Sequence, residues 1–294
     1  MSQFDLIAMT YDSAEQIASI LLLEEQCKKF DNINISAGID HLSKKGGDHA
    51  LLCYQAGELI GLLIWYTSDG IVANINGMVH PDYRRQGVFS RLLHRVKKEI
   101  QIQGLQTICY RVLSDSLSGR GYVQYLGATF SRSEYSMTLI PKIQNANTHD
   151  SDDSEGSDLY IRLEQTEDFE FLVSCLSLAF GDSESWTREY IARTNEPTRK
   201  TYIVWKNNRS VGLIRINFIN QSTAIIHDFC VLPAHQGKGI GLEILSKTVS
   251  FLLDELRMAY IKLGVVTENT RALNLYHKAG FEVTCEYQYY VSDC

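Results

Sequence analysis

The sequence predicts an α/β (α+β) fold built from two tandem copies of one domain. Three observations predict it: a repeated segment, a polar stretch between the repeats, and the same order of strands and helices on both sides of that stretch. The clearest repeat relates residues 79–93 (VHPDYRRQGVFSRLL) to residues 231–245 (VLPAHQGKGIGLEIL). The offset is 239 − 87 = 152 at the shared glycine, 212 − 61 = 151 upstream and 280 − 127 = 153 downstream. A nearly constant offset indicates a duplicated domain.

The polar stretch covers residues 145–157 (NANTHDSDDSEGS) and contains no large apolar residue. Such a segment cannot bury enough surface to offset the entropy cost of ordering it. We interpret it as an acidic linker between an N-terminal domain of residues 1–144 and a C-terminal domain of residues 158–294. An acidic segment with a binding partner of its own is the alternative.

Both domains have the same predicted elements. Turn signals at residues 56–58 (AGE) and 207–209 (NNR) each join two apolar runs into a hairpin, and a third strand follows. Ser13 is expected to cap the first helix. The corresponding helix of the second domain is expected from Thr166 to Ala179, with another at residues 186–193. The expected strands cover residues 4–9, 50–54, 59–66, 71–79 and 106–112 in the first domain and 159–163, 202–206, 211–219, 223–231 and 260–266 in the second.

A glycine-rich turn lies between the predicted strand 223–231 and a predicted helix at residues 242–258. The first turn of a helix has N–H groups without partners, and its dipole favours negative charge. Gly237, Gly239 and Gly241 carry no Cβ, so a phosphate can approach the backbone closely. The spacing excludes a Walker loop and differs from the G-x-G-x-x-G of dinucleotide sites. A glycine-rich helix start that binds nothing is the alternative.

The pattern Q-x-x-G-x-G, after a strand that ends V-x-P, resembles the acyl-CoA loop of the GNAT N-acetyltransferase superfamily. Residues 269–281 (NTRALNLYHKAGF) also match the second signature of that superfamily, N-x-x-A-x-x-L-Y-x-x-x-G-F, at every defined position. The chain is therefore identified as a tandem member. The resemblance implies two GNAT-like domains, each a mixed, largely antiparallel, splayed sheet flanked by helices. It also implies acetyl-CoA as the cofactor and direct transfer of the acetyl group to a primary amine.

The resemblance assigns cofactor contacts in the C-terminal domain. The backbone of Cys230 and Val231 is expected to bond the pantetheine arm as an adjacent strand would. Asn269 and Asn274 are candidates for polar contacts to the cofactor, and an N-cap explains Asn269 equally well. Lys238 is expected to add positive charge, with an ordinary solvated lysine as the alternative. The pyrophosphate is expected at the amides of Gln236, Gly237, Lys238, Gly239, Ile240 and Gly241.

Acetyl transfer needs a neutral amine, a donor for the developing oxyanion and a proton for the leaving thiolate. The resemblance implies that Tyr276 is the general acid; an ordinary buried aromatic is the alternative. His227 and Asp228 precede the loop and are candidates for the general base. They alternate in facing, so at most one points at the acetyl site. Glu268 is near but fits a helix-start charge, and a water relay without a dedicated base also fits. No metal site is predicted.

The N-terminal domain departs from both signatures. Phe89 stands where the C-terminal loop has its last glycine, and it either crowds the phosphate site or only repacks the helix. Val123 stands at the position of the general acid, and Tyr122 is one residue away, a helical rotation of about 100°. We therefore predict that residues 1–144 form a degenerate copy. Two alternatives stay open: an active N-terminal copy that uses Tyr122 or Tyr125 with its own acceptor, and a CoA-binding regulatory or scaffold protein without turnover.

The formal net charge is −7, from 28 basic and 35 acidic residues. This balance argues against nucleic acid as the main partner and is compatible with a cationic amine. The seven cysteines are scattered and never form a C-x-x-C pair, which is typical of a reducing cytosol. The N-terminal residues lack a signal-peptide pattern, and no apolar run approaches about 18 residues. We therefore expect a cytoplasmic protein that does not bind membranes, with the identity of the acceptor amine left open.

Overall fold

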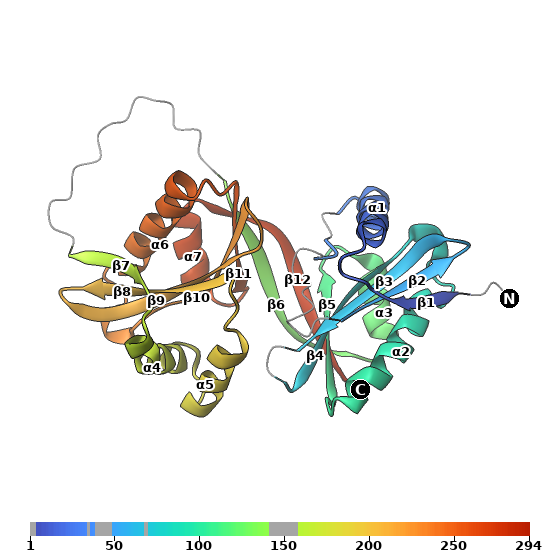
Figure 1. Cartoon of the computed structure of the whole chain (residues 1–294), viewed down its shortest axis with the longest axis horizontal. Coiled ribbons are helices and arrows are strands. Elements are labelled where there is room, and N and C mark those ends of the chain that lie inside the picture. Colours follow the sequence, from blue (N-terminus) through green and yellow to red (C-terminus); the bar gives the residue numbers. More distant parts are fainter. Residues whose placement is uncertain (1–3, 34–35, 39–48, 68–69, 141–157) are drawn as a thin grey trace, which may run out of the picture. The chain divides into compact units, whose positions relative to one another are not determined.

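The computed structural model describes residues 4–33, 36–38, 49–67, 70–140 and 158–294. The chain divides into two compact units (Figure 1). The first unit consists of Met1–Glu134 and Cys285–Cys294, and the second of Tyr135–Thr284. The predicted linker, residues 145–157, lies outside the described residues. Within the described ranges, no helix is long and apolar enough to cross a membrane.

The first repeat, residues 4–140, has the predicted order of elements. They are β1 (Asp5–Ala8), α1 (Ala14–Asp31), β2 (His49–Gln55), β3 (Glu58–Tyr66), β4 (Val72–Val79), α2 (Val88–Ile102), β5 (Thr107–Leu113), α3 (Leu117–Tyr125) and β6 (Thr129–Leu139). The predicted cap of α1 is confirmed, because the Ser13 hydroxyl accepts a hydrogen bond from the Gln16 amide. Ala56 and Gly57 have φ angles of 51° and 83° and form the predicted turn between β2 and β3. Positive φ at both central residues is what a two-residue hairpin requires.

The second repeat, residues 158–294, has the same order. Its elements are β7 (Leu159–Leu163), α4 (Phe169–Phe180), α5 (Glu184–Arg193), β8 (Arg199–Lys206), β9 (Arg209–Phe218), β10 (Thr223–Val231), α6 (Ile240–Ser250), β11 (Tyr260–Val266), α7 (Thr270–Lys278) and β12 (Phe281–Asp293). The strands β7, β10 and β11 match their predictions residue for residue. The helix predicted at residues 242–258 is shorter, because α6 ends at Ser250 and a π-helical turn, Phe251–Glu255, follows.

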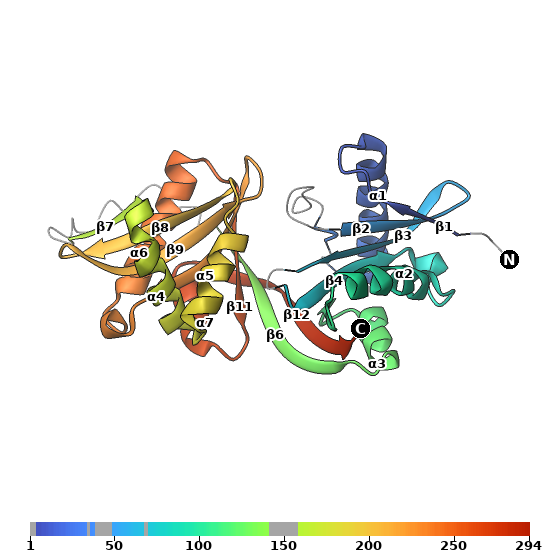
Figure 2. The same ribbon diagram turned by 60° about the horizontal axis from the view of Figure 1, so that its bottom comes forward.

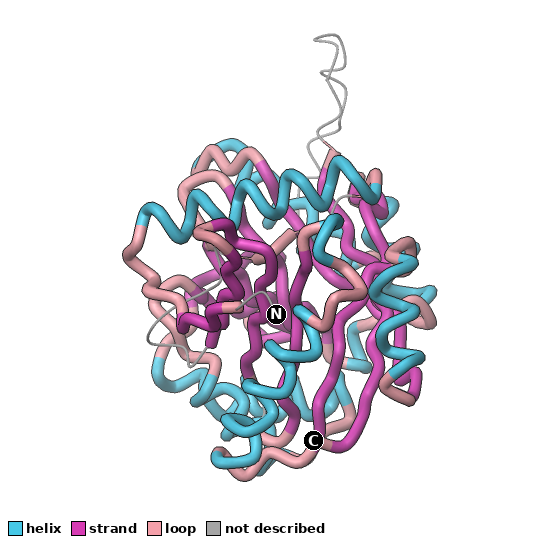
Figure 3. Tube along the Cα trace, turned by 90° about the vertical axis from the view of Figure 1, so that its right-hand side faces the viewer, coloured by secondary structure: helices cyan, strands magenta, loops and turns pink. Residues whose placement is uncertain are grey.

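Strand pairing confirms a mixed, largely antiparallel sheet in both units. In the first unit, β1, β2, β3 and β4 pair antiparallel in sequence order, and β4 pairs parallel with β5. In the second unit, β7, β8, β9 and β10 pair in the same way, and β10 pairs parallel with β11. Each sheet carries helices on both faces (Figure 2). Figure 3 shows the strands in magenta with cyan helices on both sides.

The closing strands are exchanged between the two repeats, an arrangement that the sequence analysis did not predict. The strand β12 ends the second repeat but pairs antiparallel with β5 of the first, from Tyr287 opposite Leu113 to Asp293 opposite Thr107. The strand β6 ends the first repeat but is the hydrogen-bonded neighbour of β11. Each unit is therefore completed by the last strand of the other repeat.

The repeated glycines of β3 and β9 are explained by close contacts. A Cβ on Gly61 would lie 2.7 Å from the Cγ1 of Val88, at the start of α2. A Cβ on Gly212 would collide with the backbone carbonyl of Cys230 on β10. Cβ atoms essentially never approach other heavy atoms so closely. These glycines therefore let α2 and β10 pack directly on the neighbouring strand, which fixes the elements that carry the glycine-rich turns.

Candidate active site

In the second unit, two strands separate just before the glycine-rich turn. The parallel pairing of β10 with β11 ends at Ile226 and Leu263, although β10 continues to Val231. On its other edge, β10 remains paired, with Cys230 and Val231 opposite β9. The edge of these residues toward β11 therefore has no strand partner among the described residues. This confirms the splayed sheet, and it leaves the free strand edge that a pantetheine arm needs.

The turn after β10 has the geometry of an anion site. Gly237 and Gly239 have φ angles of 77° and 78°, in the left-handed region that favours glycine. Gly239 caps α6 without a side-chain hydrogen bond. Within the described chain, the amides of residues 237–241 donate no hydrogen bond. These amides lie at the positive end of the helix dipole, where a bound phosphate would be stabilised.

Side chains of the turn stabilise its backbone. The Gln236 amide nitrogen donates to the Val231 carbonyl at 2.7 Å, and its oxygen accepts from the Arg271 guanidinium, also at 2.7 Å. Lys238 donates from Nζ to the Ala234 carbonyl at 2.9 Å. Gln236 therefore joins β10, the turn and the start of α7. Arg271, which the sequence analysis did not single out, is brought to the turn as a second positive charge.

Tyr276 lies on α7 and is 9% exposed. Its ring packs edge-on against Phe281, with the ring centroids 6.3 Å apart. Burial raises the pKa of Tyr276 to about 12, so the phenol is protonated at neutral pH. Its hydroxyl forms no hydrogen bond with any residue that the structure describes. A protonated, unengaged phenol is what a general acid for a leaving thiolate requires.

The two asparagines of the second signature have different surroundings. The Asn269 side chain accepts a hydrogen bond from the Ala272 amide at 3.1 Å and so caps α7. This supports the N-cap interpretation, in which Asn269 fixes the helix that carries Tyr276. Asn274 is exposed on α7. Of the two asparagines, Asn274 is thus the one whose side chain forms no hydrogen bond with any described residue.

A β-bulge interrupts β10 beside the predicted base residues. The register against β9 shifts between His227 and Cys230, so Asp228 and Phe229 together face one residue of β9. Asp228 has a φ of 43°, unusual for a residue other than glycine. Bulges redirect side chains and disrupt the hydrogen-bond ladder locally. His227 is half-buried where β10 leaves β11.

The Asp228 carboxylate belongs to a buried ion pair. It accepts hydrogen bonds from the Tyr190 hydroxyl, at 2.9 and 3.1 Å to its two oxygens, and from Nη1 of Arg215 at 2.9 Å. Arg215 is 2% exposed and also donates to the Thr194 hydroxyl at 3.1 Å. Burial, and then the Asp228 charge, raise the pKa of Tyr190. Because both carboxylate oxygens are engaged, Asp228 has the geometry of a positioning group.

Two further residues of this unit were missed by sequence reasoning. Arg215 lies in the apolar strand β9. A charged residue within an apolar run is the sequence signal that could have identified it. Glu164 follows β7; burial raises its pKa, while a hydrogen bond from Thr201 and the charge of Arg215 oppose that shift. The thiol of Cys230 lies 3.3 Å from the thiol of Cys175 on α4. Cys230 can therefore offer only its backbone to a cofactor.

The first unit keeps the same turn. Gly87 caps α2 with a φ of 80° and no side-chain hydrogen bond. Arg85 takes the place of Gly237 and has a φ of 63°, a conformation that is costly for arginine. Arg84 donates from Nε to the Val79 carbonyl at 3.0 Å, as Gln236 does to the equivalent carbonyl. The backbone conformation of the glycine turn is therefore similar in the two repeats.

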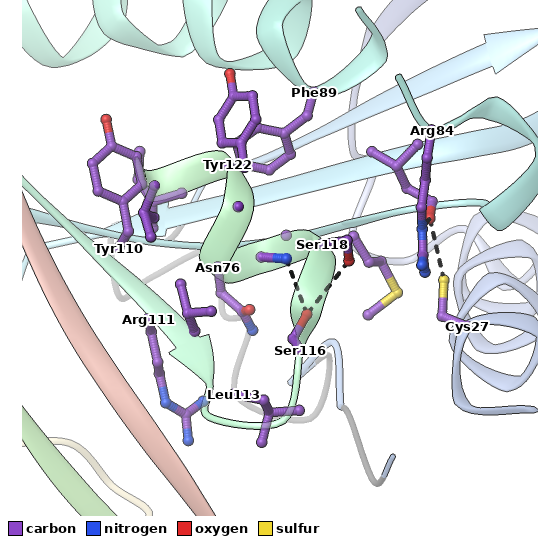
Figure 4. Close-up of a pocket in the computed structure, with 18 of the residues that line it drawn as sticks. Cys27, Asn76, Arg84, Phe89, Tyr110, Arg111, Leu113, Ser116, Ser118 and Tyr122 are labelled. Atoms are coloured by element: carbon purple, nitrogen blue, oxygen red, sulfur yellow. Dashed lines mark hydrogen bonds between the residues drawn. The ribbon is translucent and has the colours of Figure 1, made fainter. Parts of the chain in front are cut away.

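A cavity of about 430 Å³ lies in the first unit where β4 and β5 separate (Figure 4). Their parallel pairing ends at Ile75 and Tyr110. The cavity is lined from β4, β5, α2, α3 and β12. Val123, which is equivalent to Tyr276, is one of its lining residues. The cavity thus lies at the position in the first unit that is equivalent to that of Tyr276 in the second.

Phe89 repacks the first unit. A Cβ on Gly77 would lie 2.8 Å from the Phe89 ring, and that ring packs edge-on against Tyr122, with centroids 4.8 Å apart. In the second unit the bulge supplies Phe229, whose ring tip lies 3.9 Å from a Cβ built on Gly241. The phenylalanine and the glycine have therefore exchanged positions between the repeats: the strand has Gly77 and the helix Phe89 in the first, and the strand has Phe229 and the helix Gly241 in the second. The Phe89 ring therefore fills the volume over Gly77, which favours the repacking interpretation.

Tyr122 and Tyr125 both line the cavity of the first unit. The Tyr122 hydroxyl lies 3.1 Å from the Ser90 hydroxyl and is engaged by it. Tyr125 is 80% exposed. Neither phenol therefore has the buried and unengaged character of Tyr276.

No group of three or more potential metal ligands occurs within the ranges that the structure describes.

The sequence profile of the acetyltransferase (GNAT) family matches residues 15–120 and 162–281, one segment in each repeat. Spermidine N(1)-acetyltransferase of Vibrio cholerae is 34% identical over 71 residues, which are 24% of this chain and 40% of that protein. L-methionine sulfoximine/L-methionine sulfone acetyltransferase of Salmonella typhimurium is 38% identical over 63 residues, 20% of this chain and 34% of that protein. The chain therefore matches less than half the length of each relative.

Two solved structures resemble almost the whole chain. A GCN5-related N-acetyltransferase from Sphaerobacter thermophilus has a TM-score of 0.74 and 16% identity, with 99% of this chain and 95% of that chain covered. A tandem GNAT protein from the clavulanic acid biosynthesis pathway has a TM-score of 0.72 and 14% identity, with 99% and 98% covered. At these identities the likeness shows the fold alone, which is that of a tandem GNAT protein.

Proposed function

Because the chain belongs to the acetyltransferase (GNAT) family, we propose that it transfers the acetyl group of acetyl-CoA to a primary amine and that its second unit carries the reaction. The proposal rests on the surroundings of the Tyr276 phenol. This phenol is buried, has a pKa of about 12 and forms no hydrogen bond with any described residue, and it lies on the helix that follows the separating strands. The first unit has Val123 at this position and therefore has no proton donor there.

The second unit has the donors that acetyl-CoA requires. The amides of residues 237–241 would bind the pyrophosphate, with Lys238 and Arg271 close to them. The unpaired edge of Cys230 and Val231 would bond the pantetheine amides as a strand does. An anion at a helix N-terminus is stabilised by these amides together with the helix dipole.

The reaction divides into bond formation and proton transfer. The neutral amine attacks the thioester carbonyl, so that a C–N bond forms and the C–S bond breaks. Tyr276 donates its proton to the leaving thiolate, and His227, or a water that it orients, accepts the proton released by the amine. Asp228 holds the surrounding side chains in place through Arg215 and Tyr190. The products are an N-acetyl amide and the free thiol.

The acceptor is proposed only as a class. The two curated relatives are named for acetylating spermidine and methionine sulfoximine or sulfone, and the chain overlaps each of them only in part. Spermidine and methionine sulfoximine both contain a primary amine. A primary amine is therefore the shared chemistry that supports the proposal.

The release of free thiol from acetyl-CoA tests this proposal directly. We expect the full chain with acetyl-CoA to release free thiol in the presence of at least one member of a panel of polyamines, amino acids, amino sugars and peptide amines. The N-acetylated form of the active amine is the matched control and should give no release above background. Tight binding of acetyl-CoA without thiol release for any amine would instead identify a CoA-binding protein without turnover.

A further inference from the structure

The cavity of the first unit contains a positive charge that the fold does not neutralise. Arg111 lines this cavity from β5, and Figure 4 shows it beside Leu113, on the opposite side of Asn76 from Tyr110 and Tyr122. The centre of its guanidinium lies 3.4 Å from the ring centroid of Tyr287, so the two groups are stacked. Among the residues that the structure describes, no carboxylate lies within ion-pair distance of Arg111.

Other arginines of the same unit do have carboxylate partners. Arg84, which also lines the cavity, donates two hydrogen bonds of 2.7 Å to Asp31. Arg132 stacks on Tyr289, much as Arg111 stacks on Tyr287, but it also pairs with Glu134 at 2.8 Å. Arg132 is outside the cavity lining. Arg111 is therefore the stacked arginine that lines the cavity without a carboxylate partner among the described residues.

Leaving this guanidinium without a carboxylate partner has a physical cost. Arg111 is half-buried, and burial lowers its pKa, while the facing phenols of Tyr287 and Tyr289 raise it, with a net rise. The group is therefore always charged, and removing a charge from water without an oppositely charged partner is unfavourable. Stacking covers one face of the guanidinium, and hydrogen bonds to the phenols of Tyr287 and Tyr289 use part of its edge, which leaves the rest of its five N–H donors for a ligand. A planar carboxylate is the anion that fits this fork with two parallel hydrogen bonds.

The second repeat shows that the sheet does not require this charge. The parallel pairing places Tyr110 next to Ile75 in the first unit and Leu263 next to Ile226 in the second. The residue that follows is Arg111 in the first case and Gly264 in the second, where a Cβ would meet almost nothing. The same strand is therefore formed without a side chain at this position.

We propose that the cavity of the first unit binds a small organic carboxylate, with the two carboxylate oxygens held by Arg111. Ile75, Met78 and Leu113 supply apolar walls for the body of such a ligand. The volume of about 430 Å³ suits a compact molecule. This proposal concerns binding in the first unit, so it holds or fails independently of acetyl transfer in the second.

The experiment is a calorimetric titration of the full chain with matched acids and amides. The probes are propionate, 3-phenylpropionate and N-acetylglycine, each paired with its neutral primary amide. At least one acid should bind at least about tenfold more tightly than its amide, because only the acid makes the charge-assisted pair. The Arg111→Gln variant should lose that preference, and Arg111→Lys, which keeps the charge without the fork, should lose a smaller factor.

Two arginine variants serve as controls. Arg132→Gln removes a stacked arginine outside the cavity, and Arg85→Gln removes the charge at the glycine turn; both should bind the acid like the unchanged protein. Loss of binding in Arg85→Gln but not in Arg111→Gln would overturn the proposal, because the anion would then lie at the turn. Equal binding of every acid and its amide, or no binding of any acid, would also overturn it. If Arg111→Gln does not fold, the affinities of the unchanged protein for each acid and its amide still test the proposal.

Discussion

Replacing Tyr276 with phenylalanine should lower turnover by about a hundredfold or more, while the affinity for acetyl-CoA stays essentially unchanged. The reason is that the substitution removes only the proton donor. The Tyr276 hydroxyl forms no hydrogen bond with the described residues, so the ring can keep its packing against Phe281. Steady-state rates from thiol release, together with calorimetric binding of acetyl-CoA, measure the two quantities separately.

The pH profile gives a second readout of the same residue. Because the pKa of Tyr276 is raised to about 12, the phenol keeps its proton at the pH at which an ordinary tyrosine ionises. The unchanged enzyme should therefore gain activity as the amine deprotonates and show no decline up to about pH 10, where an ordinary tyrosine ionises. The control is Tyr125→Phe, which removes an exposed phenol of the first unit. Normal turnover in Tyr276→Phe would remove this residue from the mechanism.

Replacing Asp228 with asparagine should destabilise the protein by about 3–5 kcal/mol, because it leaves the buried guanidinium of Arg215 without its counter-charge. The side chains of Asp228 and Arg215 are 16% and 3% exposed, so water cannot take the place of the missing charge. Tyr190 would also lose its carboxylate acceptor. The free energy of unfolding, obtained from urea denaturation followed by circular dichroism, measures the effect.

A surface pair provides the matched control for this prediction. Glu170 accepts two hydrogen bonds from Arg188, at 2.7 and 2.6 Å, but the two side chains are 72% and 39% exposed. Because water screens exposed pairs, Glu170→Gln should change the free energy of unfolding far less than Asp228→Asn. Equal effects of the two substitutions would show that Asp228 is not a buried positioning group.

Local patterns in the sequence predicted most of the individual elements. The strands β7, β10 and β11 and the cap of α1 agree with their predictions because apolar runs, turn residues and capping residues act over a few neighbouring positions. The separation of β10 from β11 was expected from the family resemblance and is observed. The alternation of apolar and polar residues could not have predicted this separation, since it is the same in strands that are paired and in strands that have separated.

Features that depend on distant partners were not predictable in this way. The exchange of β6 and β12 does not follow from local pattern, because either closing strand fits either sheet. The bulge at Asp228 adds one residue without a distinctive sequence signal, and it made simple alternation an insufficient guide to the facing of His227 and Asp228. The pair formed by Arg215 and Asp228 joins two strands through side chains. By contrast, the exchange of a glycine and a phenylalanine can be seen in the aligned repeats, where Gly77 is equivalent to Phe229 and Phe89 is equivalent to Gly241.

The most direct test of the central claim is a calorimetric titration of the full chain with acetyl-CoA, repeated on Gly239→Glu and Gly87→Glu. Each substitution introduces a bulky negative charge at one glycine turn, where an anion is expected. Assignment of the reaction to the second unit predicts that Gly239→Glu loses a binding site that Gly87→Glu retains. Unchanged binding by Gly239→Glu, with loss in Gly87→Glu, would contradict that assignment and place the cofactor in the first unit.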